Sequence, residues 1–364
     1  MHRSVYFIVL STTLHFAQLT VSVAQTSKRY TFTNPLLPSG ADPWAIYKNG
    51  YYYYTHTLGN KLAIWKTRNM ADLKTAEKKI IFTPPPGTAY SKELWAPELH
   101  FLDGKWYMYF AADDGKNDNH RLYVLENDSK DPMSGEWKLK ARLKDDDDKW
   151  AIDGSVFRNA GQLYIVWSGW EGDTNGQQDL YIAKMKNPWT IDGKRVRISS
   201  PQFEWEKHGD LNDPVNPPHV NVNEGPQILK NGKQLYLIFS ASGCWTDHYS
   251  LGMLLIDSSA NLMDSSLWFK FQTPAFVGNE KNRVFAPGHN SFFKSPDGRE
   301  DWILYHANPA PNCGCGRQRS PRMQRFSWNE DGTPNFGIPI APGVALKIPA
   351  EQAKPVLKKV TSDK

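Results

Sequence analysis

The fold is decided by one stretch of the sequence, Val222-Asn223-Glu224-Gly225-Pro226-Gln227-Ile228-Leu229-Lys230-Asn231-Gly232-Lys233-Gln234-Leu235-Tyr236. It predicts a strand headed by a carboxylate, a tight Asn-Gly turn and a second strand. The same pattern occurs five times, with turn glycines at positions 50, 104, 161, 232 and 298. Units repeated in this way bury their apolar faces against one another, so the repeat predicts one domain of five equivalent units.

The pattern between the turns is that of an all-β protein. The 364 residues include 25 Pro and 26 Gly, and no segment has the period of a long amphipathic helix. Short apolar runs such as Trp106–Ala111, Tyr164–Ser168 and Leu235–Ser240 predict strands. Five units of four short strands predict a five-bladed β-propeller of four-stranded antiparallel blades. A large β-sandwich is the alternative, but it does not explain five copies of one pattern.

Three acidic residues share one place in the repeat. Asp42, Asp153 and Glu224 each lie eight residues before a turn glycine. Because side chains alternate between the two faces of a strand, residues at equal places in equivalent strands point the same way. We therefore expect the three carboxylates to face the propeller axis. Glu98, six residues before its glycine, and His289, nine before, are looser matches.

The positions of the three acids around a five-unit ring suggest their roles. Asp153 and Glu224 come from neighbouring units, and a carboxyl beside a like charge has a raised pKa, as a general acid needs. Asp42 comes from a unit that is not adjacent to either, so we expect it to stay ionised as the general base. Acid and base on opposite sides of a bond are typical of inverting glycoside hydrolysis, with a carboxyl separation of ~6.5–9.5 Å.

Other residues are predicted to surround this centre. Tryptophan faces stack on sugar rings, and Arg319 and Arg322 could donate hydrogen bonds to sugar hydroxyls or to the acids. Glu98 could instead hold neighbouring side chains. His289 could be an ordinary buried histidine or could help to hold a central Ca²⁺ or Na⁺ ion through waters. The loop 113–119 lacks the ligand spacing of an EF-hand and is expected to be a solvated turn. The predicted substrate-binding residues are Trp44, Trp95, Glu98, Trp170, Trp245 and Arg322.

The N-terminus predicts export. In residues 1–24 an apolar run from Val5 to Leu10 is followed by the small-residue site Ser22-Val23-Ala24, the pattern of a secretory signal peptide. We therefore expect residues 25–364 to form a secreted or periplasmic single domain that binds no membrane and acts as a monomer. A net charge of +5, thinly spread, argues against a nucleic-acid partner.

Three cysteines remain to be paired. Cys244 could bridge to Cys313 or to Cys315, tying the fourth unit to the fifth, or all three could be buried thiols. A zinc site is not expected, because a single Cys-x-Cys lacks two further ligands at suitable spacing.

Six segments, in this order, carry a family resemblance: Gly40-Ala41-Asp42-Pro43-Trp44, Trp95-Ala96-Pro97-Glu98, Ile152-Asp153-Gly154-Ser155, Asn223-Glu224-Gly225-Pro226, Pro287-Gly288-His289-Asn290-Ser291 and Arg319-Ser320-Pro321-Arg322-Met323-Gln324. The set resembles glycoside hydrolase family 43 over about residues 30–349. The resemblance implies a five-bladed propeller and inverting hydrolysis of arabinose or xylose linkages. It implies Asp42 as the general base, Asp153 as the pKa-modulating and orienting acid, and Glu224 as the general acid. It also implies no cofactor for the chemistry, and a calcium or sodium ion near the histidine.

Within the family, the first, second and last segments look most like exo-acting α-L-arabinofuranosidases. We therefore expect release of terminal α-L-arabinofuranose from arabinan or arabinoxylan, or from their oligosaccharides. The alternatives are a β-xylosidase or an endo-arabinanase of the same family, and a sugar-binding propeller without turnover. The five axis positions are not identical (Asp, Glu, Asp, Glu and His), which favours one catalytic centre over repeated lectin sites.

Overall fold

The computed structural model describes Met1 and residues 31–209 and 220–351. Apart from Met1, the predicted signal peptide, residues 1–24, lies outside the described residues. The described residues from Thr31 to Glu351 belong to one compact unit. Within its described residues, five antiparallel sheets of four strands each confirm the predicted propeller. No helix there is long and apolar enough to span a membrane.

The five blades follow the chain without interruption. The first contains β2 (Trp44–Lys48), β3 (Tyr51–Thr55), β4 (Leu62–Thr67) and β5 (Glu77–Phe82). The second contains β6 (Lys92–Leu102), β7 (Lys105–Asp113), β8 (Arg121–Asn127) and β9 (Lys138–Leu143). The third contains β10 (Ala151–Asn159), β11 (Gln162–Gly169), β12 (Asp179–Asn187) and β13 (Thr190–Ser199).

The fourth blade contains β14 (Asn223–Asn231), β15 (Gln234–Ala241), β16 (Ser250–Asp257) and β17 (Phe269–Lys270). The fifth contains β18 (Phe285–Lys294), β19 (Asp301–Asn308), β20 (Ser320–Trp328) and β21 (Pro334–Asn335). Short 3-10 helices lie in the connections: η1 (Met70–Thr75), η2 (Asn117–Asn119), η3 (Glu204–Glu206) and η4 (Ser265–Leu267).

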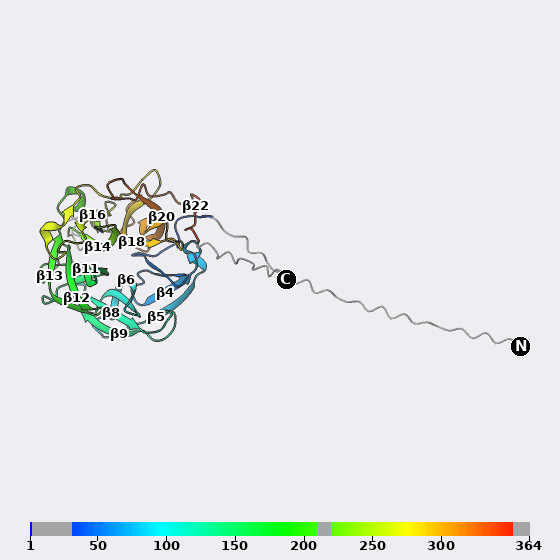
Figure 1. Cartoon of the computed structure of the whole chain (residues 1–364), viewed down its shortest axis with the longest axis horizontal. Coiled ribbons are helices and arrows are strands. Elements are labelled where there is room, and N and C mark those ends of the chain that lie inside the picture. The colour runs from blue at the N-terminus through cyan, green and yellow to red at the C-terminus, as the bar shows by residue number, and fades with distance from the viewer. Residues whose placement is uncertain (2–30, 210–219, 352–364) are drawn as a thin grey trace, which may run out of the picture. The chain divides into compact units, whose positions relative to one another are not determined.

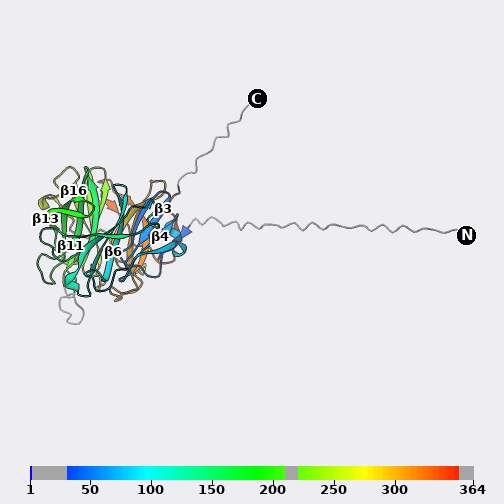
Figure 2. The same ribbon diagram turned by 90° about the horizontal axis from the view of Figure 1, so that it is seen from below.

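The first strand of each blade lies at the centre of the ring. In Figure 1 the labels β6, β14 and β18 lie near the middle, and β5, β9 and β13 lie at the rim. Figure 2 shows the ring edge-on. Each inner strand contacts the inner strand of the next blade, including β18 with β2. Residues at the start of the inner strands are therefore brought together from all five blades.

The first and fifth blades are joined by two short strands and by the segment that precedes β2. Strand β1 (Thr31–Phe32) pairs with β22 (Leu346–Lys347). Asn34 exchanges two hydrogen bonds of 2.9 and 3.0 Å with the backbone of Met323 in β20. Leu36 N donates to Pro321 O at 2.8 Å, and Gly40 N donates to Arg319 O at 2.9 Å. These bonds fix the segment that leads into Asp42.

The hydrophobic core is divided among the blade interfaces. Five clusters of buried side chains each join two neighbouring blades, as between Ile64 of β4 and Trp106 of β7. The cluster containing Tyr54 and Leu304 joins the first blade to the fifth. Burying one large apolar side chain contributes about 1.5–3 kcal/mol, so each interface holds its blades firmly.

The turn in the fourth blade differs from the sequence prediction. Asn231 pairs with Gln234, so Gly232 and Lys233 are the central turn residues, rather than Asn231 and Gly232. In the third blade the central residues are Ala160 and Gly161, both with positive φ. Counting back from the glycine therefore misplaces Glu224 by one residue. The prediction that it occupies the same strand position as Asp153 is wrong.

Candidate active site

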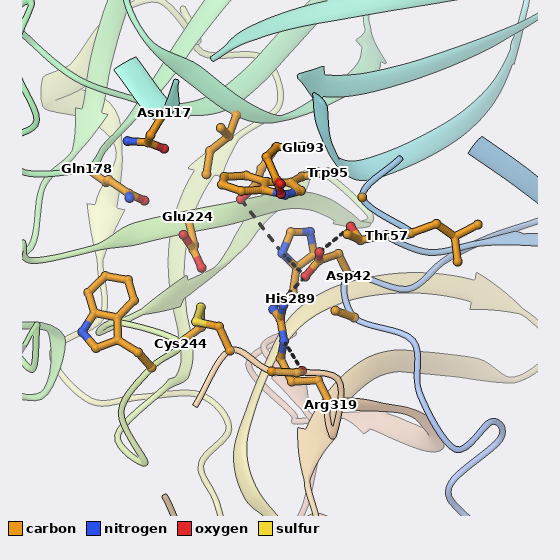
Figure 3. Close-up of a pocket in the computed structure, with 18 of the residues that line it drawn as sticks. Asp42, Thr57, Glu93, Trp95, Asn117, Gln178, Glu224, Cys244, His289 and Arg319 are labelled. Carbon is orange, nitrogen blue, oxygen red and sulfur yellow. Dashed lines mark hydrogen bonds and ion pairs between the residues drawn. A yellow bond between two sulfur atoms is a disulfide. The ribbon is translucent and has the colours of Figure 1, made fainter. Parts of the chain in front are cut away.

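A cavity of about 790 Å³ opens where the inner strands begin, and residues of all five blades line it. Figure 3 shows Asp42 and Glu224 facing this pocket from different sides, with Trp95 and Arg319 among its walls. The lining residues are Ser39, Ala41, Asp42, Thr57, Leu58, Gly59, Glu93, Trp95, Asn117, Asp118, Trp150, Ile152, Asp153, Asn175, Gln178, Glu224, Cys244, Trp245, His289, Cys315, Gly316, Arg317 and Arg319. The structure thus brings the three predicted acids into one pocket.

Breaks in the strand ladders turn several of these side chains inward. Asp153 and His289 fall in β-bulges of β10 and β18, and their φ angles are 57° and 47°. Asp42, just before β2, has φ 57°. Bulges redirect side chains near functional sites, and positive φ is strained for a residue with a Cβ. In β14 the bulge position is Gly225, with φ 56°, and Glu224 precedes it.

Asp42 is held by four neighbours. Thr57 Oγ1 donates to its Oδ2 at 2.6 Å, and its own backbone N donates to His306 Nδ1 at 3.1 Å. Its Oδ1 lies 3.3 Å from His289 Nδ1 and 3.4 Å from Arg319 Nη1. Burial alone would raise the pKa of Asp42, but His289, Arg319 and the Thr57 hydroxyl hold this pKa below its usual value. Asp42 is therefore ionised at neutral pH.

Asp153 and Glu224 form a coupled pair on neighbouring blades. Gly225 N donates to Asp153 Oδ2 at 3.0 Å, and the Tyr249 hydroxyl donates to Glu224 Oε1 at 2.7 Å. Burial, followed by the charge of Glu224, raises the pKa of Asp153 well above its usual value. Burial, followed by the charge of Asp42, raises the pKa of Glu224 to about 7, against the effect of the Tyr249 hydrogen bond. The pair therefore retains a proton near neutral pH.

His289 lies between the acids. Its Nδ1 is 3.3 Å from Asp42 Oδ1 and 4.0 Å from Asp153 Oδ2, and burial lowers its pKa. Within residues 31–209 and 220–351, no group of three His, Cys, Asp or Glu side chains could hold a metal ion directly. The calcium or sodium ion expected at His289 through waters stays a prediction, and the chemistry below does not depend on it.

Two of the predicted substrate-binding residues lie behind the pocket. Glu98 is buried, with His100 Nε2 at 2.9 Å from its Oε2 and Gln227 donating to its Oε1. Trp44 donates its indole N–H to Leu99 O at 3.0 Å and packs on the His100 ring. Neither residue lines the pocket. Glu98 therefore has the supporting position that the sequence left open, and Trp44, which was predicted to bind substrate, lies outside the pocket lining.

The tryptophans divide into wall and core. Trp95 and Trp245 line the pocket as predicted. Trp170 does not line it: it is 1% exposed and stacks on Trp150, with ring centroids 4.6 Å apart and an angle of 7°. Trp150 faces the cavity instead. The prediction that Trp170 binds substrate is therefore corrected, because another indole covers it.

Arg322 is also misplaced by the sequence prediction. It lies within β20, opposite Tyr305 of β19, and is 1% exposed. It does not line the pocket. Arg319 precedes β20 and reaches Asp42. Side chains alternate between the two faces of an extended chain, so residues three positions apart point to opposite faces. Only Arg319 therefore points into the cavity.

Several pocket residues were missed by the sequence reasoning. The loop predicted to be a solvated turn contributes Asn117 and Asp118 to the wall. Cys244 is bonded to Cys315, and this disulfide lines the pocket between the fourth and fifth blades. Cys313 is the free thiol. Of the missed residues, only Trp150 could have been found from the sequence, because it directly precedes the strand that contains Asp153.

Comparisons with known proteins agree with this geometry. A sequence profile described as "Glycosyl hydrolases family 43" matches residues 32–334. An extracellular exo-α-(1→5)-L-arabinofuranosidase from Streptomyces avermitilis is 36% identical over 334 residues, which cover 89% of this chain and 66% of that protein. α-L-Arabinofuranosidase 43 from Humicola insolens is 33% identical, with 93% of this chain and 70% of that protein covered. This chain thus spans slightly less than two thirds of the Streptomyces protein's length.

Among solved structures, that of an α-L-arabinofuranosidase from Lactobacillus brevis superposes with a TM-score of 0.79 and 35% identity, covering 86% of this chain and 98% of that chain. A thermostable family-43 glycoside hydrolase, at 23% identity and a TM-score of 0.71, shares the fold. Because the profile match extends over most of the propeller that carries the three-acid pocket, the chain belongs to glycosyl hydrolase family 43.

Proposed function

We propose that this chain is an inverting glycoside hydrolase that releases terminal α-L-arabinofuranose from arabinan- or arabinoxylan-type polysaccharides or their oligosaccharides. One observation carries the proposal: the carboxyls of Asp42, Asp153 and Glu224, from three separate blades, line a single pocket. Membership of the family supports the reaction class. The names of the relatives at 33–36% identity support the sugar and the exo mode of attack.

Glu224 is the general acid of the proposed reaction. It gives its proton to the glycosidic oxygen while the bond from that oxygen to the anomeric carbon breaks. With a pKa of about 7, about half of these carboxyls carry a proton at neutral pH and can release it to the leaving oxygen. Burial is the largest cause of this shift.

Asp42 is the general base. It accepts a proton from a water molecule that attacks the anomeric carbon on the face opposite to the leaving oxygen, which inverts the configuration. Its pKa, held below the usual value, keeps it ionised over the working pH range. Thr57 and His306 fix the carboxylate and its backbone.

Asp153 is the pKa-modulating and orienting acid of the proposed reaction. Its Oδ2 accepts the Gly225 N–H, so it binds the backbone directly next to Glu224. Burial, followed by the charge of Glu224, raises the pKa of Asp153 itself, so the two carboxyls influence each other's protonation. Trp95 and Trp245 supply flat faces for sugar rings, and Asn117 and Gln178 supply amides for sugar hydroxyls.

The protein is exported and works as a monomer in this proposal. Two relatives are named as extracellular enzymes, in agreement with the N-terminal prediction.

Product analysis on linear arabinan, branched arabinan and arabinoxylan tests the proposal, with arabinose expected as the early product. Glu224→Ala should lose ~100-fold or more in turnover of an unactivated α-L-arabinofuranoside, because general acid catalysis contributes 10²–10⁴-fold. Glu126→Ala, which removes a carboxylate bonded to Lys105 in the second blade, is the control and should stay active. Wild-type turnover in Glu224→Ala contradicts the assignment. Binding of oligosaccharide without any hydrolysis would instead indicate a sugar-binding propeller.

A further inference from the structure

Tyr249 reaches the proton-donating carboxyl from behind the pocket. It is 1% exposed and directly precedes β16, and its hydroxyl donates to Glu224 Oε1 at 2.7 Å. It is not among the residues that line the catalytic pocket. It lines a second cavity of about 560 Å³ instead. Tyr249 therefore contacts Glu224 without facing the space in which a substrate would bind.

The ring of Tyr249 is held on two sides. It is parallel to the His306 ring within 2°, at a centroid distance of 5.7 Å. On another side it lies against the backbone of Gly288, where an added Cβ would be 2.1 Å from the tyrosine Cε1. Any residue other than glycine at position 288 would displace the ring. The hydroxyl that contacts Glu224 is therefore fixed in place.

The backbone around Glu224 is held as well as its side chain. Glu224 pairs with Ser240 across β14 and β15. His289 N donates to Ser240 Oγ at 2.7 Å, which ties this pair to the fifth blade. The Tyr249 hydroxyl donates to Glu224 Oε1, so both the strand position and the carboxyl of Glu224 are fixed.

We propose that Tyr249 is a positioning residue that fixes the rotamer of Glu224 and leaves Oε2 as the oxygen that carries the catalytic proton. This inference rests on the proposed function, in which Glu224 is the general acid. Because Oε1 accepts the tyrosine proton, the acid proton sits on the other oxygen. A carboxyl fixed in this way presents one defined O–H to the glycosidic oxygen, which is what proton transfer in a transition state requires.

The other groups that face Glu224 come from three other blades. Asp42 ahead of β2 raises its pKa and Arg319 ahead of β20 lowers it, while the charge of Glu224 itself raises the pKa of Asp153 in β10. The His289 ring of β18 lies against the neighbouring Gly225. The hydrogen bond from Tyr249 stabilises the ionised carboxylate, so it lowers the pKa of Glu224. Removing the hydroxyl should raise this pKa and move the basic limb of the pH profile to higher pH.

Tyr249→Phe tests the inference, because it keeps the ring and removes only the hydroxyl. Tyr52→Phe is the matched control: its hydroxyl donates to Lys294 O at 2.9 Å, away from the pocket, and the side chain is also fully buried. Both variants are assayed on an α-1,5-linked arabino-oligosaccharide, which needs a proton at the leaving oxygen. They are also assayed on 4-nitrophenyl α-L-arabinofuranoside, whose leaving group barely needs one.

We expect kcat of Tyr249→Phe on the oligosaccharide to fall ~10–100-fold with little change in KM, and on the aryl substrate by less than ~3-fold, since misaligned acid catalysis affects only the poor leaving group. The basic limb of the pH–activity profile of Tyr249→Phe should move to higher pH. Gly288→Ala, whose added Cβ would displace the Tyr249 ring, should give an effect in the same direction. It serves as the test if Tyr249→Phe does not fold.

An equal loss on both substrates, a change in KM alone, or behaviour like Tyr52→Phe would overturn the positioning role while leaving the proposed function intact. Other results would contradict the proposed function itself: a wild-type protein that hydrolyses neither substrate, or a Glu224→Gln variant that retains full activity on the oligosaccharide.

Discussion

Replacing Arg319 with methionine should move the whole pH–activity profile to higher pH. Arg319 Nη1 lies 3.4 Å from Asp42 Oδ1, with side-chain exposures of 16% and 10%. At an effective dielectric constant of about 20, two unit charges at this distance interact by about 5 kcal/mol. One pKa unit corresponds to about 1.36 kcal/mol, so about 3.5 units is the upper bound. Screening by water in the open pocket reduces this, and we expect a rise of ~1–2 units in the pKa of Asp42.

The sign follows from the role of each group. Asp42 must be ionised, so activity is lost as the pH falls through its pKa, and a higher pKa moves the acidic limb up. Arg319 also lowers the pKa of Glu224. Its removal therefore raises the basic limb as well, and both limbs shift in the same direction.

The assay is kcat/KM against pH on an arabino-oligosaccharide, which reports the pKa values of the free enzyme. Arg317→Met is the control. Arg317 lines the same pocket, but it is not among the groups that set the pKa of Asp42. Its acidic limb should move less. An Arg319→Met variant that stays active with its acidic limb unchanged or lowered would refute the electrostatic reasoning.

Other predictions concern the pocket walls and the acid. The wild-type basic limb should lie near pH 7, the pKa of Glu224, and kcat/KM should fall above it; a basic limb above pH 9 would contradict this. Cys244→Ser opens the disulfide to Cys315, which joins residues 71 apart in the sequence. Denaturant titration should show a free energy of unfolding lower by ~2–4 kcal/mol, and kinetics should show a higher KM. Unchanged stability and KM would count against a structural role of the disulfide. Trp170→Ala should destabilise the fold by ~3–5 kcal/mol, because the side chain is buried. Trp245→Ala should raise KM with little change in melting temperature, because this side chain lines the pocket. A stable Trp170→Ala with a raised KM, or an unstable Trp245→Ala with an unchanged KM, would refute this assignment.

The fold and the three acids could be predicted because both repeat along the chain. A turn and two strands, written five times, indicated the blades and their inner strands. The repeat failed where the turn chemistry changed. In the fourth blade the glycine is the first central turn residue rather than the second, so Glu224 lies one residue before the bulge position held by Asp153. The carboxyl still faces the pocket, because it is Gly225 that takes the strained backbone angle.

The depth of a side chain could not be predicted from the local sequence. Trp170 and Trp150 look alike in the sequence, but only the contacts between loops decide which one covers the other. Arg319 and Arg322 differ because β20 begins between them. The choice of Cys315 over Cys313 likewise depends on how two distant loops meet. Long-range contacts of this kind leave no trace in a pattern of period two.

The stereochemistry of the first product tests the central claim most directly. Proton NMR during hydrolysis of an α-linked arabinofuranoside follows the anomer before it equilibrates in water. An acid at Glu224 and a base at Asp42 on opposite sides of the bond predict that β-arabinofuranose appears first. First release of the α-anomer would contradict the account.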